Sequence, residues 1–266
     1  MNIRLGIEGM RAEGLIVEVR DRIGYATIDR PERLNALSSG LRVALVEAFD
    51  DFHRDPDVWA VVLAATGERS FSAGIDLKEA AEEGSRPTEP MRGVAREAFE
   101  AVLECGVPTI AAINGWALGG GMELALACDM RVLARHALMG MPEVKRGMGG
   151  NFGAQLLART VPSAVAYELL YLGESIDADT ALRLGLVNRV VDGDDLAATV
   201  EDLARRIVAL APVTQQRYKA AIQRGRDLPL AAALRLDVRP SPYLSEDRRE
   251  GVAAFVEGRE PRWANR

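Results

Sequence analysis

Two glutamates lie where their carboxyl groups could transfer protons at neutral pH. Glu123 comes two residues after a run of three glycines and precedes the apolar segment Leu124–Ala127. Partial burial among such neighbours raises a carboxyl pKa, which suits proton transfer. Glu143 follows Met141 and Pro142 on a second glycine-flanked segment. The alternative interpretation is that each glutamate only compensates the dipole at the start of a helix.

Two glycine-containing segments are candidates for binding a polarised oxygen. They are Phe71–Leu77 (FSAGIDL) and Asn114–Leu124 (NGWALGGGMEL). Glycine lets a ligand approach the backbone closely, and the N–H groups at a helix start have no acceptor within the helix. Two such N–H groups that converge on one carbonyl oxygen form an oxyanion hole. The alternative is that the glycines only allow a helix to pack tightly against a strand.

Other catalytic and metal-binding patterns are missing from the sequence. The chain has two histidines, His53 and His136, for which surface or capping roles are expected, and two cysteines, Cys105 and Cys128. Their spacing fits no zinc site, so we expect two buried free thiols in a reducing cytoplasm. There is no P-loop and no Gly-x-Gly-x-x-Gly pattern, and Ser72 lacks the leading glycine of a nucleophile elbow.

Alternating strands and helices must position the glutamates and the glycine segments. Apolar runs predict strands at 15–20, 24–29, 58–65, 71–73, 109–114, 130–134, 137–141 and 186–191. Helical spacing predicts a helix capped by Ser38, others at 91–104 and 122–128, one capped by Asn151, one beginning at Pro162 and one capped by Asp177. The stretch 79–90 lacks periodicity and is expected to be a loop or a frayed helix. This alternation indicates an α/β body at 1–193, followed by a helical region at 194–266.

Length and charge exclude several classes of protein. The 266 residues carry 33 basic and 39 acidic side chains, a net charge of −6, so non-specific nucleic-acid binding is not expected. No apolar run is long enough to span a membrane, and the first residues do not form a signal peptide. A cytoplasmic enzyme of ordinary globular composition is the expectation.

Six motifs, in order along the chain, resemble the enoyl-CoA hydratase/isomerase (crotonase) superfamily from about residue 15 to residue 263. They are Asp29–Leu37 (DRPERLNAL), Phe71–Leu77, Ala112–Asp129, Met141–Glu143, Leu184–Asn188 (LGLVN) and the tail from Ser245 to Pro261. The resemblance implies a spiral of ββα units at 1–193 that holds the acyl-CoA site. It also implies that the helical region at 194–266 forms a homotrimer, often doubled to a hexamer.

The resemblance also assigns roles to individual residues. The backbone N–H groups of Ile75 and Gly120 would form an oxyanion hole for a thioester, and Glu123 and Glu143 would flank one water molecule. The resemblance implies no metal and no redox cofactor. Coenzyme A is part of the substrate and is therefore not counted as a cofactor. The residues expected to bind coenzyme A are Arg33, Ala36, Ala73, Asp76, Leu77, Phe255 and Arg259. For the two arginines, a solvated surface charge is the alternative.

The presence of both glutamates favours an enoyl-CoA hydratase that acts on a trans-2-enoyl-CoA. Another acyl-CoA dehydratase, isomerase or lyase of the same superfamily is the first alternative, and a non-catalytic acyl-CoA-binding subunit is the second. The stretch 79–91 is expected to shape the acyl pocket.

Overall fold

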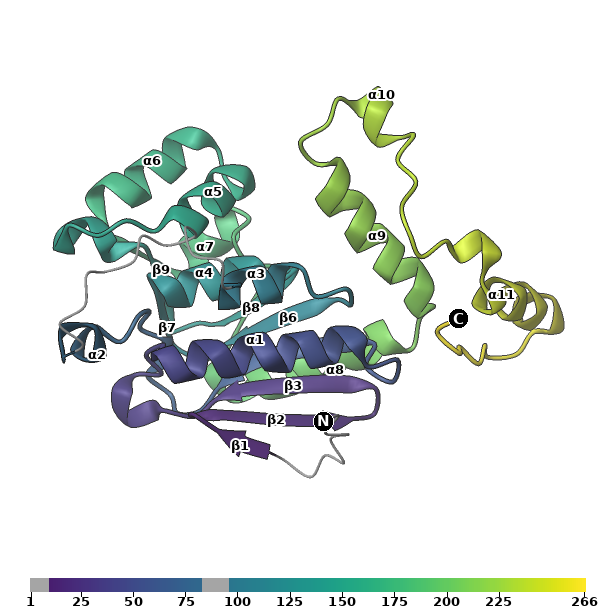
Figure 1. The fold of residues 1–266 in the computed structure, drawn as a ribbon, viewed down its shortest axis with the longest axis horizontal. Coiled ribbons are helices and arrows are strands. Elements are labelled where there is room, and N and C mark those ends of the chain that lie inside the picture. Colours follow the sequence, from purple (N-terminus) through teal and green to yellow (C-terminus); the bar gives the residue numbers. More distant parts are fainter. Residues whose placement is uncertain (1–9, 83–95) are drawn as a thin grey trace.

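The computed structural model describes residues 10–82 and 96–266, and their strands form two sheets (Figure 1). The larger sheet contains, in spatial order, β1 (Met10–Ala12), β2 (Leu15–Arg20), β3 (Ile23–Ile28), β4 (Ala60–Ala65), β6 (Thr109–Ile113), β8 (Met130–Ala134) and β11 (Arg189–Val191). The smaller sheet contains β10 (Ser175–Asp177), β9 (Leu138–Gly140), β7 (Trp116–Leu118) and β5 (Ser70–Ser72). Neighbouring strands are parallel from β3 to β11 and from β9 to β5. The α/β class predicted from the sequence is confirmed.

Helices connect and cover these strands. They are α1 (Ser39–Arg54), α2 (Leu77–Glu82), α3 (Ala98–Leu103), α4 (Gly120–Ala127), α5 (Asn151–Thr160), α6 (Ser163–Leu172), α7 (Ala178–Arg183), α8 (Leu196–Val208), α9 (Pro212–Gly225), α10 (Leu230–Ala233) and α11 (Glu246–Glu257). Short 3-10 turns lie at η1 (Pro31–Arg33), η2 (Pro142–Arg146), η3 (Gly193–Asp195) and η4 (Pro242–Leu244).

The larger sheet is covered on both faces, as β3 illustrates. An ideal Cβ on Gly24 would lie 2.7 Å from ring carbons of Phe52 on α1, so this position faces α1. The next residue, Tyr25, donates a hydrogen bond of 2.6 Å to Glu201 on α8. Because successive strand residues face opposite sides of a sheet, α1 and α8 cover opposite faces. Burial on both faces explains why β4 is a continuous apolar run.

Helix α1 forms where the sequence predicts it. The Ser38 hydroxyl accepts a hydrogen bond from the Leu41 N–H at 3.2 Å, and the buried side chains of the helix are Leu41, Leu45, Ala48, Phe49 and Phe52. The apolar helix α4 is buried along its whole length and packs against β5, β7, α3 and α5. It therefore forms the centre around which the candidate site segments are arranged.

Several local expectations need correction. Asn151 is the first residue of α5 and not its cap; Gly150 occupies the N-cap and has no side-chain oxygen. Three strands of three residues, β1, β7 and β10, were not predicted, because such short strands show no alternation. Within the described residues the helix expected at 91–104 begins at Ala98, and most of the stretch expected to shape an acyl pocket lies outside them.

The region after residue 193 has two parts. Helix α8 packs against β3, β4, β6 and β8, whereas α9, α10 and α11 project from the body (Figure 1). Cys105 and Cys128 are free and buried, as predicted. Among the helices that the structure describes, none combines the length and apolar character needed to cross a bilayer.

Candidate active site

The turn after β5 presents one backbone N–H group without an acceptor. Gly74 has a φ of +89°, a conformation that favours glycine. Its N–H donates to the Ser72 hydroxyl at 3.2 Å, and its carbonyl accepts from Leu37 at 2.8 Å. These bonds fix the turn, while the N–H of Ile75 donates to no acceptor within residues 10–82 and 96–266.

The three glycines before Glu123 have three different roles. Gly119 is the N-cap of α4 and has a φ of +55°. An ideal Cβ on Gly121 would lie 2.1 Å from the Ser72 carbonyl oxygen, so Gly121 allows the helix to pack on β5. Gly120 is the first residue of α4, and its N–H has no acceptor in the described part of the chain. The tight-packing interpretation therefore describes Gly121; Gly120 is less tightly packed, since an ideal Cβ on it would lie 3.2 Å from a Leu37 methyl carbon.

The two N–H groups without acceptors belong to adjacent backbone segments. An ideal Cβ on Gly74 would lie 3.0 Å from the Gly120 nitrogen, and an ideal Cβ on Gly120 would lie 3.5 Å from the Gly74 Cα. The turn that carries Ile75 thus lies directly against the start of α4. One oxygen placed between these segments could accept hydrogen bonds from both N–H groups.

Glu123 lies in the first turn of α4 and is 5% exposed. Its Oε1 accepts a hydrogen bond of 2.7 Å from the N–H of Gly153, in the first turn of α5. Helix α5 has no side-chain cap of its own, so the Glu123 carboxylate takes this role from a neighbouring helix. The same bond fixes the orientation of Glu123.

Glu143 approaches the same point from η2. An ideal Cβ on Gly150 would lie 3.1 Å from Oε1 of Glu143 and 3.2 Å from Oε1 of Glu123. The two carboxyl groups therefore lie against the same glycine. Oε2 of Glu143 is buried and has no hydrogen-bond partner within the described residues, so it can accept a hydrogen bond from a small ligand.

Burial controls the electrostatics of both carboxyl groups. It raises the pKa of Glu123 to about 7; the Gly153 N–H opposes this shift, and the charges of Glu143 and Glu97 add to it. Burial also raises the pKa of Glu143, against an opposing effect of Arg146. The sequence-based expectation of a raised Glu123 pKa is confirmed. A pair of carboxyl groups with raised pKa values is suited to moving protons near neutral pH.

Aromatic rings form one wall beside the glutamates. Phe99 on α3 and Phe152 on α5 stack with their ring centroids 5.4 Å apart. The Phe99 ring lies 3.5 Å from the position of an ideal Cβ on Gly120, and Phe152 immediately precedes Gly153. Sequence reasoning missed these rings, and it also missed Gly150 and Gly153. The glycine-rich run after Glu143 was the available signal for the two glycines.

Five of the residues expected to bind coenzyme A lie near the Ile75 turn: Arg33, Ala36, Ala73, Asp76 and Leu77. Arg30 links them, because its guanidinium donates to the Ala36 carbonyl and pairs with Asp76 at 3.2 Å. Burial opposes ionisation of Asp76, but the Glu79 N–H and the charges of Arg30 and Arg33 hold its pKa below the usual value. Leu77 is exposed beside this cluster.

The other two expected residues, Phe255 and Arg259, lie elsewhere. Phe255 is exposed on α11, which projects from the body on the side away from α2 and β7 (Figure 1). Arg259 follows α11 and pairs with Glu250 and Glu257 at 2.6 Å. The structure does not bring either residue to the site within one chain.

Neither histidine belongs to the site. The Nδ1 atom of His53 accepts a hydrogen bond of 2.8 Å from the Gly106 N–H. The Nε2 atom of His136 lies 3.1 Å from the Glu68 carbonyl oxygen and 3.0 Å from that of Asn114. Both rings thus hold neighbouring loops together, which leaves proton transfer at the site to carboxyl groups.

Comparisons with known proteins find similarity along almost the whole chain. The family model described as enoyl-CoA hydratase/isomerase matches residues 18–266. The chain is 36% identical to the short-chain-enoyl-CoA hydratase of Clostridium acetobutylicum, covering 94% of this chain and 97% of that protein. It is 39% identical to the (E)-benzylidenesuccinyl-CoA hydratase of Thauera aromatica, with coverages of 92% and 96%. The crystal structure of enoyl-CoA hydratase from Mycobacterium tuberculosis H37Rv superposes with a TM-score of 0.87 at 34% identity, with coverages of 95% and 99%.

The raised pKa of Glu123 predicts a pH-dependent stability difference for Glu123→Gln. Between the ordinary glutamate value and about 7, the folded chain retains a proton that the unfolded chain releases, so wild-type stability falls as pH rises. The variant lacks this titration and keeps an oxygen that can accept from Gly153. The unfolding free energy of Glu123→Gln minus that of wild type should therefore be larger at pH 8 than at pH 5, by roughly 2–3 kcal/mol.

Denaturant unfolding at the two pH values measures this difference. Glu47→Gln, which changes an exposed glutamate on α1, is the matched control and should show no such increase. An equal stability difference at pH 5 and pH 8 for Glu123→Gln would show that burial does not hold a proton on Glu123.

Proposed function

The chain belongs to the enoyl-CoA hydratase/isomerase family, and from this premise we propose that it adds water across the 2,3 double bond of a trans-2-enoyl-CoA. One observation carries the proposal. Glu123 and Glu143 lie against the same glycine, and the adjacent N–H groups of Ile75 and Gly120 have no acceptor among the described residues. The names of the relatives support the general reaction.

We infer that the thioester oxygen accepts hydrogen bonds from Ile75 and Gly120. Attack of water on the β-carbon moves negative charge onto this oxygen. Two preorganised donors stabilise that charge, and each contributes about 3–4 kcal/mol where such donors have been removed. Because Gly120 is the first residue of α4, the positive end of the helix dipole supports the same charge.

The two glutamates would complete the addition of water. One carboxylate takes a proton from the water as its oxygen bonds to the β-carbon, and the other carboxyl group supplies a proton to the α-carbon. The two titrations are coupled, so the acid and base roles belong to the pair. The unpartnered Oε2 of Glu143 supports a water-binding role for this group. The proposed steps require no metal or redox cofactor.

Coenzyme A would extend from the oxyanion hole across Ala36, Ala73, Asp76 and Leu77, with Arg33 near its phosphates. This placement follows from their position around the Ile75 turn: the Ala73 N–H donates to Leu34 at 3.0 Å, and Leu37 pairs with Ile75. Arg33 is exposed, so it can contact a phosphate without losing a buried partner.

Glu123→Gln and Glu143→Gln should each lower the turnover of crotonyl-CoA hydration by about a hundredfold or more, the usual effect of losing a general acid or base. The affinity for a saturated acyl-CoA should change much less, since the amide keeps the shape of the side chain. Loss of the enoyl chromophore measures turnover. A variant with near wild-type turnover would remove that glutamate from the mechanism.

Gly120→Pro should lower turnover by about a hundredfold or more, because proline has no N–H to donate. Proline is tolerated in the first turn of a helix, where Gly120 lies, so the protein should still fold. Gly120→Ala is the matched control: it keeps the N–H, and its Cβ would lie 3.2 Å from a Leu37 methyl group and 3.5 Å from the nearest backbone atom. A folded Gly120→Pro protein with the turnover of Gly120→Ala would exclude Gly120 from the oxyanion hole.

We further propose that the projecting helices assemble a homotrimer or a dimer of trimers. Ile222, Leu234, Leu244, Phe255 and Val256 are each at least 68% exposed, more apolar surface than isolated chains usually present.

Light scattering at micromolar concentration should therefore give about three or six times 28.8 kDa. Phe255→Glu should lower this mass, because it places a charge in the predicted contact. Val43→Glu, on exposed α1 surface, should leave the mass unchanged and serves as the control. A monomeric wild-type protein would contradict the assembly.

A further inference from the structure

Arg42, on the first turns of α1, has a guanidinium group that is mostly without hydrogen-bond partners. Its Nη1 lies 3.6 Å from Oε2 of Glu97. Its Nε is buried and has no partner, and elsewhere in residues 10–82 and 96–266 the guanidinium meets no acceptor. The side chain is 34% exposed, so its outer part remains accessible.

This arrangement is unusual for a partly buried arginine. The Nε and Nη2 atoms form the edge of a guanidinium that binds a carboxylate with two parallel hydrogen bonds. Arg131, by comparison, donates to the carbonyls of Leu186, Ala125 and Cys128. Arg42 instead keeps its carboxylate-binding edge unused, although a buried unpaired donor is unfavourable.

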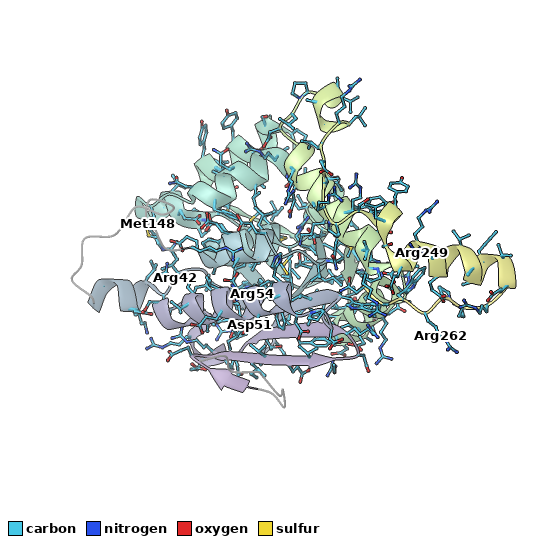
Figure 2. All side chains as sticks on the ribbon, turned by 45° about the vertical axis from the view of Figure 1, so that its right-hand side comes forward. Arg42, Asp51, Arg54, Met148, Arg249 and Arg262 are labelled. Atoms are coloured by element: carbon cyan, nitrogen blue, oxygen red, sulfur yellow. The ribbon has the colours of Figure 1, made fainter. Side chains whose placement is uncertain are left out.

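The position of Arg42 connects it with the acyl end of the candidate site. Helix α1 packs against α3, where Glu97 is the N-cap, and the charge of Glu97 acts on Glu123. Phe99, two residues further along α3, lies against Gly120. Arg42 and Met148 lie at the same end of the molecule, whereas Arg54 lies further along α1 (Figure 2).

We propose that Arg42 binds a carboxylate on the distal part of the acyl group, so that the substrate is a carboxylated enoyl-CoA. The inference rests on the proposed function, which places the β-carbon between the two glutamates. From there an acyl chain that follows the Phe99 wall runs towards the junction of α1 and α3. The ligand carboxylate would pair with the accessible outer part of the guanidinium while Nη1 stays with Glu97.

The charges around the site favour an anionic over a cationic acyl group. Glu97 is already engaged, because it caps α3 in a reciprocal arrangement with Glu100 and pairs with Arg42. Burial also favours the uncharged form of Glu123 and Glu143. At the junction of α1 and α3, the group with an unpaired polar atom is therefore the cationic guanidinium of Arg42.

Binding of saturated acyl-CoA molecules tests Arg42 without catalysis. By calorimetry, wild-type protein should bind adipoyl-CoA about tenfold or more tightly than hexanoyl-CoA, a ratio expected for a charge-assisted hydrogen bond. Arg42→Gln should bring the ratio close to one. Arg42→Lys should give an intermediate ratio, because it keeps the charge but loses the planar edge. Arg54→Gln, on the exposed side of the same helix, should keep the wild-type ratio.

Turnover tests the same assignment in the reaction. The kcat/KM ratio of hexenedioyl-CoA to hexenoyl-CoA should be about ten or more for wild type and should fall at least fivefold in Arg42→Gln. Absence of hydration for both substrates would contradict the proposed function, while the binding ratio would still decide the role of Arg42.

Three results would overturn the proposal. One is equal wild-type affinity for adipoyl-CoA and hexanoyl-CoA. Another is an equal loss of affinity for both in Arg42→Gln, which would indicate that Arg42 only supports α3. The third is tighter wild-type binding of 4-trimethylammoniobutanoyl-CoA than of adipoyl-CoA, which would indicate that Glu97 selects a cationic acyl group.

Discussion

The close approach of the turn after β5 to the start of α4 is the constraint on which the site depends. Gly121 and Gly74 leave room for it, since a Cβ on either would lie within 2.8 Å of a backbone oxygen. Parallel pairing of β5 with β7 brings the two segments to the same edge of the smaller sheet. If either glycine carried a side chain, the N–H groups of Ile75 and Gly120 would move apart. Their convergence is therefore a property of backbone packing.

Placement of Glu123 follows from the same helix. Because α4 is buried along its length, a glutamate in its first turn must find a partner, and the Gly153 N–H at the start of α5 provides it. One carboxylate thus stabilises a neighbouring helix and is held beside Glu143. The burial that fixes the side chain also disfavours its charged form, which raises its pKa to about 7. Position and proton affinity have a common cause.

The projecting C-terminal helices are connected to this body by a small number of polar contacts. The Lys219 ammonium on α9 is buried, and it lies 2.8 Å from Oδ2 of Asp129 and 2.9 Å from the Val107 carbonyl oxygen. Asp129 in turn accepts hydrogen bonds from the N–H and hydroxyl of Thr109 at the start of β6. This ion pair of the buried Lys219 ammonium helps to fix where α9 leaves the body, although the apolar surface beyond it remains exposed within one chain.

The sequence alone determined the α/β alternation and most strands and helices, and its resemblance to the family indicated the two glutamates as a pair. These features follow from local periodicity, helix caps such as Ser38, and motif order, all of which act over short stretches. Only the tertiary structure decided how Gly119, Gly120 and Gly121 differ in packing. It also decided that the Gly153 N–H donates to Glu123 and that Arg42 pairs with Glu97. It also decided that Phe255 lies far from the other site residues in one chain. Such relations depend on distances between segments remote in the sequence, and no local pattern encodes those distances.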